Sequence, residues 1–548
     1  MNEPLEVDFA ELERALERAQ PLLAATDHQL FTVTVHALHQ VTVELDDKTT
    51  TIGRLRQMIF GKKSEKSRDV LKPTSASMER AHREKPKREA PPRGHGRNSV
   101  EAYTGATTVC IKHPQFEAGE RCPECQKGKL HPFAPTQLIR ISGQAALNAT
   151  RYVLEKLRCG LCGMLFTAPL PAGVGKEKYA PSAVAMLAAV KYNLATPSNR
   201  LEGMQASLGV PLPAGTQAQL LGNGAVTLKP VFKALIHCAA QGDIFYNDDT
   251  SARILKLMQQ AKALKAQAST QSPAATATSA GKDNADPSRT GVFTTAIVVT
   301  SQEHRIALFF TGPKHAGENL ATVLAHREPG LPAPIQICDA LPCNTVPACN
   351  TQVANCNTHA RRKMVDIVTR FPEQCAWVIG IYRVVYENDQ HCTDQGLSAE
   401  ARLAWHQTHS AGPMADLRRW CDEQFAQRRV EPNSALGKAI KYLTKHWDRL
   451  TLFLRKAGVP LDTNIVEQTL KTAILVRKNS LFFKTQKGAA CADLFMSLIK
   501  TCRFHGVDAF HYLTSLLTHA TEIQQAPERW LPWNYTQTMA ALTATNTS

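Results

Sequence analysis

Short apolar runs make residues 244–339 the part of the chain with the clearest strand pattern. The runs are residues 244–248, 292–300, 304–312 and 333–339. Residues 317–326 differ, because their apolar positions recur at helical spacing. The second and third runs lie close enough in sequence to form a tight hairpin. The pattern therefore predicts a strand, a hairpin, a helix and a further strand, in that order.

Two of the predicted strands end at an acidic residue. Asp248 closes the first run, and Asp339 closes the last. The order strand with acid, strand, strand, helix, strand with acid is that of an RNase H-like α/β core, a mixed sheet covered by helices. In that order the first and last of these strands are neighbours. We therefore expect Asp248 and Asp339 to lie side by side on adjacent strands.

The stretch LDTNIVEQTLKTAILVRKNSLFF, residues 461–483, predicts a helix that packs on this sheet. Asp462 is a candidate N-cap. The apolar stripe of the helix consists of Val466, Leu470 and Ala473. Glu467 falls on the neighbouring stripe with Asn464 and Lys471, so it can face the acidic pocket while the apolar stripe packs. For an isolated helix, an exposed ion pair between Glu467 and Lys471 is the simpler interpretation.

Two C-x-x-C pairs precede the predicted sheet. They are Cys122 with Cys125 and Cys159 with Cys162. Each pair can turn two thiolates toward one ion, and two pairs complete a closed tetrahedral Zn²⁺ site with a structural role. The sequence between the pairs contains β-like runs that could form a hairpin arm. The pattern predicts a zinc ribbon, and unliganded cysteines are the alternative.

The charge of the chain favours a polyanionic partner. Its 548 residues include 64 Lys and Arg against 48 Asp and Glu, which gives a formal net charge of +16. Nucleic acid is the commonest polyanion, although a basic enzyme without such a partner remains an alternative. The N-terminal sequence lacks a signal-peptide pattern, and no apolar run reaches the ~20 residues that cross a bilayer. With cysteines scattered over a long chain, we expect a soluble protein of the cytoplasm.

Shifts in composition divide the chain into regions. Residues 9–23 and 51–62 have helical spacing, residues 62–97 are charged and contain Pro and Gly, and residues 262–289 are a low-complexity tract. Residues 181–221 predict a helix, a short helix and a helix, which suits either a helix-turn-helix arrangement or plain helical packing. We predict a multidomain α+β chain. Its N-terminal part consists of a helical oligomerisation or DNA-binding region (1–70), a basic flexible linker (71–108), a zinc ribbon (109–170) and a helix-turn-helix-like domain (171–240). An RNase H-like domain (241–490), with an insertion loop (254–290) and a helical insertion (367–433), and a C-terminal helical region (491–548) follow.

A series of motifs resembles one known family. The motifs are LRQMIFGKKSEK (55–66), the two C-x-x-C pairs, the KYN and PLPAGTQ segments, DDT (248–250), CNTHARRK (356–363), DTNIVEQTLK (462–471), RKNSLFF (477–483) and LIKTCRFHGVD (498–508). Through them the chain resembles transposases of the insertion sequence 66 family. The resemblance implies a DDE-type transposase with an RNase H-like catalytic domain, a zinc-binding region and N-terminal DNA-binding and oligomerising parts. By motif position it assigns Asp248 as the first catalytic acid and Glu467 as the third, while Asp339 is predicted from its place after the fourth strand.

Three convergent carboxylates suit two Mg²⁺ or Mn²⁺ ions, which prefer oxygen ligands. We expect the trio to hold these ions for DNA cleavage at the element ends and for strand transfer. The residues expected to contact DNA are Arg361, Arg362, Lys363, Lys471, Arg477 and Lys478, and ordinary solvated charges are the alternative. Cys356 and His359 have C-x-x-H spacing at a helix start, which suits a small metal site or a histidine that packs or contacts phosphate.

The expected partners are double-stranded DNA of the element ends and target, further copies of the chain in a homo-oligomer, and accessory proteins of the same element. We expect association with the bacterial nucleoid and no membrane partner. Asp339 is followed by Ala-Leu-Pro-Cys, where the family usually has Gly-Tyr or a similar pair. This departure leaves open a catalytically silent, transposase-derived DNA-binding protein. A zinc-dependent hydrolase is disfavoured, because the closed cysteine site has no free ligand position.

Overall fold

The computed structural model describes residues 9–36, short stretches between 119 and 171, residues 177–260, and residues 291–547 apart from 302 and 348. The chain divides into two compact units, residues 73–146 and residues 147–548 together with 1–72. In the smaller unit, Arg121 and Lys129 form an antiparallel bridge. The predicted helix at 51–62, the basic linker at 62–97 and the low-complexity tract at 262–289 lie outside the described residues.

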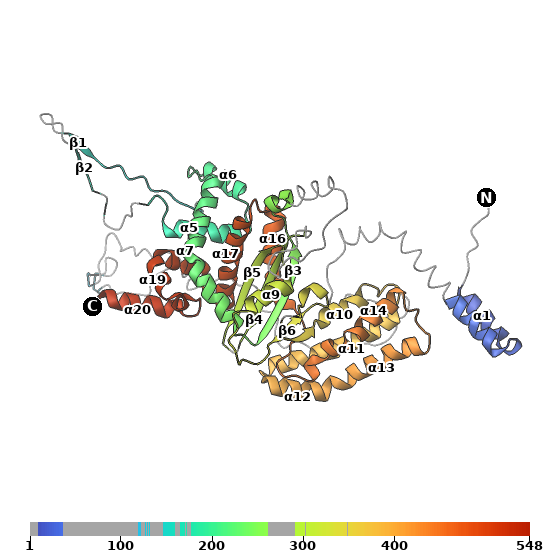
Figure 1. Ribbon diagram of the computed structural model, residues 1–548. Helices are drawn as coiled ribbons and strands as arrows, with labels where there is room; N and C mark the ends of the chain where they lie inside the picture. The colour runs from blue at the N-terminus through green and yellow to red at the C-terminus, as the bar shows by residue number, and fades with distance from the viewer. Residues whose placement is uncertain are drawn as a thin grey trace, which may run out of the picture. The chain divides into compact units, whose positions relative to one another are not determined.

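A five-stranded mixed sheet forms the centre of the larger unit (Figure 1). Its order is β5 (Arg305–Gly312), β4 (Phe293–Thr300), β3 (Ile244–Ser251), β6 (Ile335–Cys338) and β7 (Gln352–Asn355). The first three strands pair antiparallel, whereas β6 pairs parallel with both β3 and β7. The four predicted strands are confirmed, as is the helix between the third and fourth, α9 (Ala316–Leu324). The chain is therefore a mixed α and β protein.

Two features of the sheet differ from the sequence-based prediction. Strand β3 continues through Ser251, so Asp248 lies within a strand that was predicted to end there. Pairing with β4 along the whole of β3 extends the strand beyond its apolar part. Strand β7 was not predicted, because the segment QVAN has no run of large apolar residues. It forms because it pairs with β6 from Ile335 to Cys338.

The edge strand β5 is covered by helix α17 (Gln486–Phe504). Three polar side chains of α17, one turn apart, accept hydrogen bonds from every second backbone N–H of β5. Thr501 Oγ1 accepts from Ala307 at 3.1 Å, Ser497 Oγ from Phe309 at 2.9 Å, and Asp493 Oδ2 from Thr311 at 2.7 Å. Buried N–H groups need such partners, so these residues stabilise an edge that would otherwise be unpaired. We call Asp493, Ser497 and Thr501 the α17 polar row.

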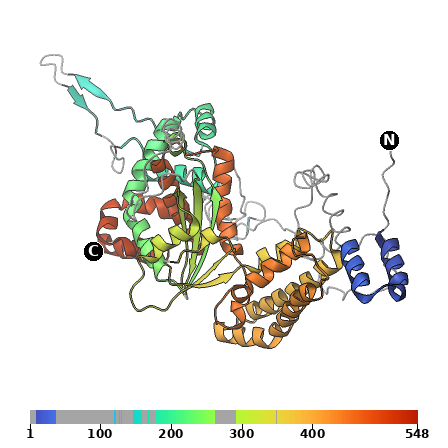
Figure 2. The ribbon, with the colours of Figure 1, turned by 45° about the vertical axis from the view of Figure 1, so that its right-hand side comes forward.

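Helices N-terminal to the sheet pack on the same side as α17 (Figures 1 and 2). They are α5 (Pro181–Ala188), a π-helical turn at Ala189–Asn193, α6 (Ser198–Ser207) and α7 (Ala214–Ala240). The predicted succession of helix, short helix and helix is confirmed. Gly224 on α7 permits close packing, because a Cβ atom there would lie 2.9 Å from Val184 Cγ1 of α5.

A group of helices follows β7 and lies on the β6 side of the sheet in both views (Figures 1 and 2). It comprises α10 (Asn357–Val365), α11 (Pro372–Asp394), α12 (Ala399–His409), α13 (Ala411–Ala426), α14 (Ala435–Lys445) and α15 (Trp447–Leu450). Tyr382, Leu417 and Ile440 are fully buried between them. The chain then returns to the sheet through α16 (Asn464–Ser480) and α17.

The ends of the described chain are helical. The N-terminal helix α1 (Phe9–Ala19) confirms the predicted amphipathic helix, and residues 25–36 are also helical. The C-terminal helices are α18 (Ala509–Thr518), α19 (Ala520–Gln525) and α20 (Tyr535–Thr547). In the described parts of the chain, every helix is too short or too polar to traverse a lipid bilayer.

Candidate active site

The first two predicted acids lie at the same end of neighbouring parallel strands. The last residue pair between β3 and β6 is Tyr246 with Ile337. Asp248 and Asp339 each follow that pair by two residues, so they lie at the same level along the two strands. The predicted adjacency of the two strands is confirmed. Both side chains are half-buried.

Asp248 lies among other acidic groups. The pKa of Asp248 is raised from its ordinary value of 3.8 to about 7, mainly by burial and to a smaller extent by the neighbouring carboxylates of Asp339, Asp249 and Glu467. The backbone N–H of Asp249, which donates to Asp248 Oδ1 at 2.8 Å, opposes this shift. Mutual repulsion between carboxylates is a common cause of such a shift. Asp339 and Glu467 are thus near enough to Asp248 to interact with it, although burial accounts for most of the raised pKa.

Asp339 is held by the turn that follows it. Its Oδ1 accepts a hydrogen bond from the backbone N–H of Leu341 at 3.1 Å and another from the side-chain amide of Asn344. The backbone carbonyl of Asn344 in turn accepts from Asn247 Nδ2 at 2.9 Å and from Gln336 Nε2 at 2.7 Å. These buried amides connect β3, β6 and the turn, so they fix the position of the Asp339 carboxylate relative to the sheet.

Glu467 reaches the site from the first turn of α16. The predicted N-cap was wrong: Thr463 occupies the N-cap position without a side-chain cap hydrogen bond, and Asp462, one residue earlier, accepts from the Asn464 backbone N–H at 3.0 Å. Thr463 Oγ1 donates to Glu467 Oε1 at 3.1 Å and so orients the carboxylate. The predicted stripe of Val466, Leu470 and Ala473 is buried. Because α16 packs on β3 and β4, Glu467 lies beside Asp248.

The two residues with C-x-x-H spacing lie next to the third acid. Cys356 immediately precedes α10, and His359 is in its first turn. His359 Nδ1 lies 3.7 Å from Glu467 Oε1. One ligand atom from each of Cys356, His359 and Glu467 lies within 4.8 Å of the others. The sequence spacing indicated the first two residues but gave no sign that Glu467 completes the group.

A further acid and histidine at the site were missed by the sequence analysis. Asp249 Oδ2 lies 2.9 Å from His315 Nδ1 and accepts the backbone N–H of Ala316 at 3.3 Å. His315 caps α9, so this contact joins β3 to that helix. The sulfur of Cys343 lies near the same atoms. The DDT motif contains Asp249, but only the three-dimensional structure brings His315 to it.

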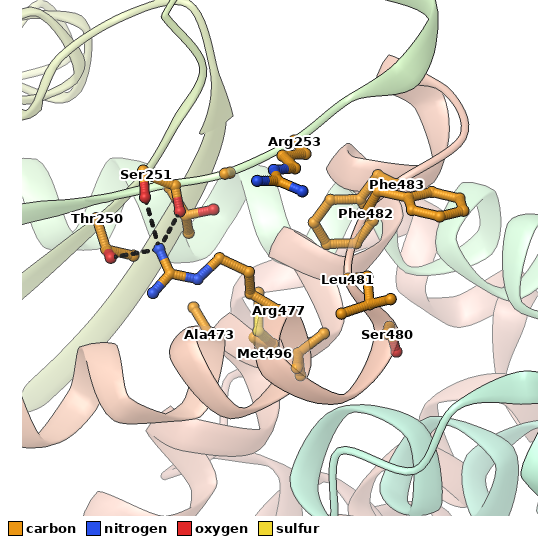
Figure 3. A pocket seen from close by; sticks show the side chains of 13 residues that line it. Thr250, Ser251, Arg253, Ala473, Arg477, Ser480, Leu481, Phe482, Phe483 and Met496 are labelled. Atoms are coloured by element: carbon orange, nitrogen blue, oxygen red, sulfur yellow. Dashed lines mark hydrogen bonds between the residues drawn. The ribbon is translucent and has the colours of Figure 1, made fainter. Parts of the chain in front are cut away.

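The basic residues predicted to contact DNA have different surroundings. Arg477 points from α16 toward the end of β3, where its Nη1 donates to Thr250 Oγ1 at 2.9 Å and to Ser251 Oγ at 2.8 Å (Figure 3). These residues line a small cavity together with Phe482 and Phe483. Arg477 therefore joins α16 to β3. By contrast, Lys363, Lys471 and Lys478 are exposed, and Arg361 and Arg362 are half-buried on α10.

The four cysteines of the predicted zinc ribbon, Cys122, Cys125, Cys159 and Cys162, lie outside the described residues. The second pair falls between β1 (Lys156–Arg158) and β2 (Leu165–Thr167), which pair antiparallel. The zinc site stays a prediction.

The structure defines a mixed α and β protein in which acidic side chains lie at one end of neighbouring parallel strands. Comparison with known proteins narrows this class. The family model for transposases of the IS66 family matches residues 176–491, and the chain belongs to this family. Membership implies that the protein binds DNA and depends on divalent metal in general, and it suggests a transposase function.

Relatives in Sinorhizobium fredii cover much of the chain. The chain is 29% identical over 436 residues to the protein named uncharacterized protein y4jD, which covers 77% of this chain and 79% of the relative. It is 24% identical over 418 residues to uncharacterized protein y4hP, which covers 71% of this chain and 68% of the relative. These similarities extend beyond the acidic site but assign no activity to its residues.

Proposed function

We propose that this chain is a DNA transposase in which Asp248, Asp339 and Glu467 hold Mg²⁺ or Mn²⁺ for cleavage and strand transfer at the ends of its element. One observation carries the proposal: Asp248 and Asp339 lie at the same end of the adjacent parallel strands β3 and β6, and Glu467 of α16 is among the acids that interact with Asp248. Strongly shifted pKa values at convergent acids are typical of functional sites.

The donor chemistry of the site fits these cations. Mg²⁺ and Mn²⁺ prefer carboxylate oxygens and retain open positions for phosphate and water. Asp248 has three acidic neighbours, Asp339, Asp249 and Glu467, and a divalent cation would offset their repulsion. Cation binding would thereby return Asp248 to its ionised form near neutral pH. The three acids thus favour oxygen-preferring cations over a closed structural metal.

The strand order and the element order support an RNase H-like interpretation of the core. The sequence strand, strand, strand, helix, strand is present, and the first and fourth strands are adjacent. Glu467 comes from a later helix packed on the same sheet. The proposed catalytic fold and the proposed trio therefore rest on the same arrangement.

In the proposed reaction, the protein positions the metal ions and the DNA and forms no covalent bond to the DNA. Bound divalent ions would activate the attacking water or 3′-hydroxyl and stabilise the leaving oxygen. Asp339 is oriented by Leu341 and Asn344, and Glu467 by Thr463, so neither carboxylate must reorganise during the reaction. The exposed Lys471 lies on the same helix as Glu467, where it can attract the DNA backbone.

The test is divalent-ion-dependent cleavage of DNA that carries the element ends. Separate substitutions Asp248→Ala, Asp339→Ala and Glu467→Ala should each lower cleavage at least ~1000-fold, because each removes a ligand of ions that contribute several kcal/mol. DNA binding should remain. Asp416→Asn, an exposed acid of α13, is the control and should cleave normally. Cleavage retained in any alanine variant contradicts that assignment, and a wild-type chain that binds DNA without cutting favours the catalytically silent alternative.

A further inference from the structure

Cys356, His359 and Glu467 form a group that the three-acid site does not explain. Cys356 lies at the start of α10 and Glu467 in the first turn of α16. One ligand atom from each of the three residues lies within 4.8 Å of the other two. The set offers sulfur, nitrogen and oxygen, whereas the acids around Asp248 offer oxygen alone.

The imidazole of His359 supplies the strongest indication of a ligand. Its Nδ1 is buried, and no hydrogen-bond partner reaches it within the described part of the chain. Leaving a buried nitrogen unpaired is unfavourable, which makes such atoms uncommon in folded proteins. Nδ1 lies 3.7 Å from Glu467 Oε1, too far for a hydrogen bond. A cation between these two atoms would satisfy both of them.

The spacing of these atoms suits a small tetrahedral ion. With metal–ligand bonds of ~2.0 Å, two ligands of a tetrahedral Zn²⁺ ion lie ~3.3 Å apart. The 3.7 Å between His359 Nδ1 and Glu467 Oε1 is close to that length. The sulfur of Cys356 needs a modest approach to complete three ligands. Small side-chain rotations would therefore close the site.

Burial raises the pKa of the Cys356 thiol, and hydrogen bonds to its sulfur from Thr463 and from the His359 backbone oppose this rise. The Cys356 side chain is fully buried, and its Sγ accepts the backbone N–H of Thr463 at 3.4 Å. The positive end of α10, a nine-residue helix, stabilises negative charge on the sulfur. The side chains of His359 and Glu467 are 24% and 26% exposed, which gives an ion access from solvent.

We propose that Cys356, His359 and Glu467 form a three-ligand site for Zn²⁺ or a similar borderline-soft cation, and that this ion inhibits the enzyme by withdrawing Glu467 from the acids around Asp248. Thiolate and imidazole ligands select such ions over Mg²⁺. When the ion binds, the Cys356 thiol releases its proton to solvent and the sulfur–metal bond forms, without oxidation or reduction. Only the inhibitory consequence depends on the proposed transposase function.

Cobalt binding tests the site without reference to activity. The full-length chain is first saturated with Zn²⁺, excess metal is removed by gel filtration, and Zn²⁺ in sites that exchange readily is replaced by Co²⁺. The wild-type protein should bind one more Co²⁺ per chain than Cys356→Ser or His359→Ala, with a sulfur-to-cobalt charge-transfer band that both variants lack. Cys375→Ser is the matched control, since Cys375 is a buried free cysteine of α11 outside the group.

Equal Co²⁺ stoichiometry and equal spectra in the wild-type, Cys356→Ser and His359→Ala proteins would overturn the site. Circular dichroism checks folding, and His359→Ala decides the outcome if Cys356→Ser does not fold. Asp248→Asn separates the two proposals, because it should retain the cobalt band whether or not the acids are catalytic. Loss of the band in folded Asp248→Asn would contradict a site independent of Asp248.

Zinc inhibition of Mg²⁺-supported cleavage tests the regulatory consequence. Half-inhibition of Cys356→Ser should require at least ~10-fold more Zn²⁺ than half-inhibition of the wild-type protein, because loss of one ligand costs at least ~1.4 kcal/mol of binding. The Cys375→Ser control should match the wild type. Equal inhibition of Cys356→Ser and the wild type would overturn the inhibitory role.

Discussion

Two aspartates of this protein have the same raised pKa but different surroundings. Burial raises the pKa of both Asp248 and Asp493 to about 7. Asp493 is 6% exposed on α17, and it accepts hydrogen bonds from the backbone N–H of Thr311 at 2.7 Å and from its hydroxyl at 2.6 Å. Asp248 accepts from its own neighbour Asp249 and lies among other acids. A raised pKa therefore does not by itself identify a functional carboxylate.

The difference between the two sites is in what surrounds each carboxylate. Both hydrogen-bond donors to the Asp493 side chain come from one residue of β5, Thr311. The carboxyl group therefore completes the hydrogen bonding of the sheet edge. The site of Asp248 accumulates negative charge from β3, β6 and α16. The first arrangement stabilises the fold, whereas the second leaves a charge imbalance that a cation can relieve. The following experiments test this distinction.

The largest expected contrast is in stabilisation by Mn²⁺. At a hundredfold excess over Kd, Mn²⁺ should raise the free energy of unfolding of the wild-type protein by about 2.7 kcal/mol. Asp493→Asn should retain this increase, and Asp248→Asn should lose most of it. Denaturant titrations with and without Mn²⁺ measure the difference. Equal stabilisation of both variants would remove the distinction between the two aspartates.

Deleting the Asp493 carboxyl group should destabilise the edge of the sheet. Asp493→Ala leaves the Thr311 N–H without its partner, which should lower the free energy of unfolding by about 1–3 kcal/mol. Ser497→Ala, which removes the acceptor of Phe309, should cost less because a hydroxyl is a weaker acceptor than a carboxylate. Urea unfolding measures both changes. A loss below about 0.5 kcal/mol for Asp493→Ala would show that water replaces the carboxylate.

Both aspartates should make the metal-free protein less stable as pH rises. The folded-state pKa of about 7 exceeds the ordinary 3.8, so their contribution is complete below pH ~4 and is lost as pH rises through about 7. Each group contributes a slope of up to about 1.4 kcal/mol per pH unit between pH ~5 and ~7. Asp493→Asn should flatten the dependence of the free energy of unfolding on pH at all Mn²⁺ concentrations. Mn²⁺ should remove only the part of this pH dependence that Asp248 contributes. Denaturant unfolding across this pH range measures the slope of the free energy of unfolding against pH. A slope in Asp493→Asn equal to that of the wild-type protein would contradict the raised pKa of Asp493.

The smallest expected effects concern DNA binding by exposed lysines of α16. Lys471→Ala and Lys478→Ala should each weaken binding a few-fold, irrespective of DNA sequence, and lower the slope of log affinity against log salt by about 1. Lys229→Ala on α7 is the control, because this exposed lysine is on a different helix. Fluorescence anisotropy at several salt concentrations measures the slope. An unchanged slope in both α16 variants would exclude their contact with DNA phosphates.

The sequence was most informative where the apolar pattern was strong. It predicted β3, β4, β5 and β6, because each contains a run of buried apolar residues. It also predicted the buried face of α16 and therefore the place of Glu467. It missed β7, whose QVAN segment becomes a strand only through pairing with β6. The roles of the three acids stay predictions.

Contacts between distant segments account for most of what the sequence could not indicate. The Asp249–His315 pair joins residues 66 positions apart, and Glu467 meets His359 from a different helix. Arg477 donates hydrogen bonds to Thr250 and Ser251, which the sequence did not indicate, and its contact with DNA stays a prediction. Local pattern reports which face of an element is buried, whereas these contacts depend on how the elements pack.

The α17 polar row also limits how copies of this protein can assemble. An exposed edge strand offers a template on which another chain can add by β-augmentation, and exposed edges promote aggregation. Asp493, Ser497 and Thr501 occupy the outward N–H groups of β5, and Gln486 Nε2 donates to the Thr311 carbonyl at 2.8 Å. A second sheet cannot continue from β5 while α17 is in place. Any assembly that brings DNA ends together must therefore use surfaces other than this edge.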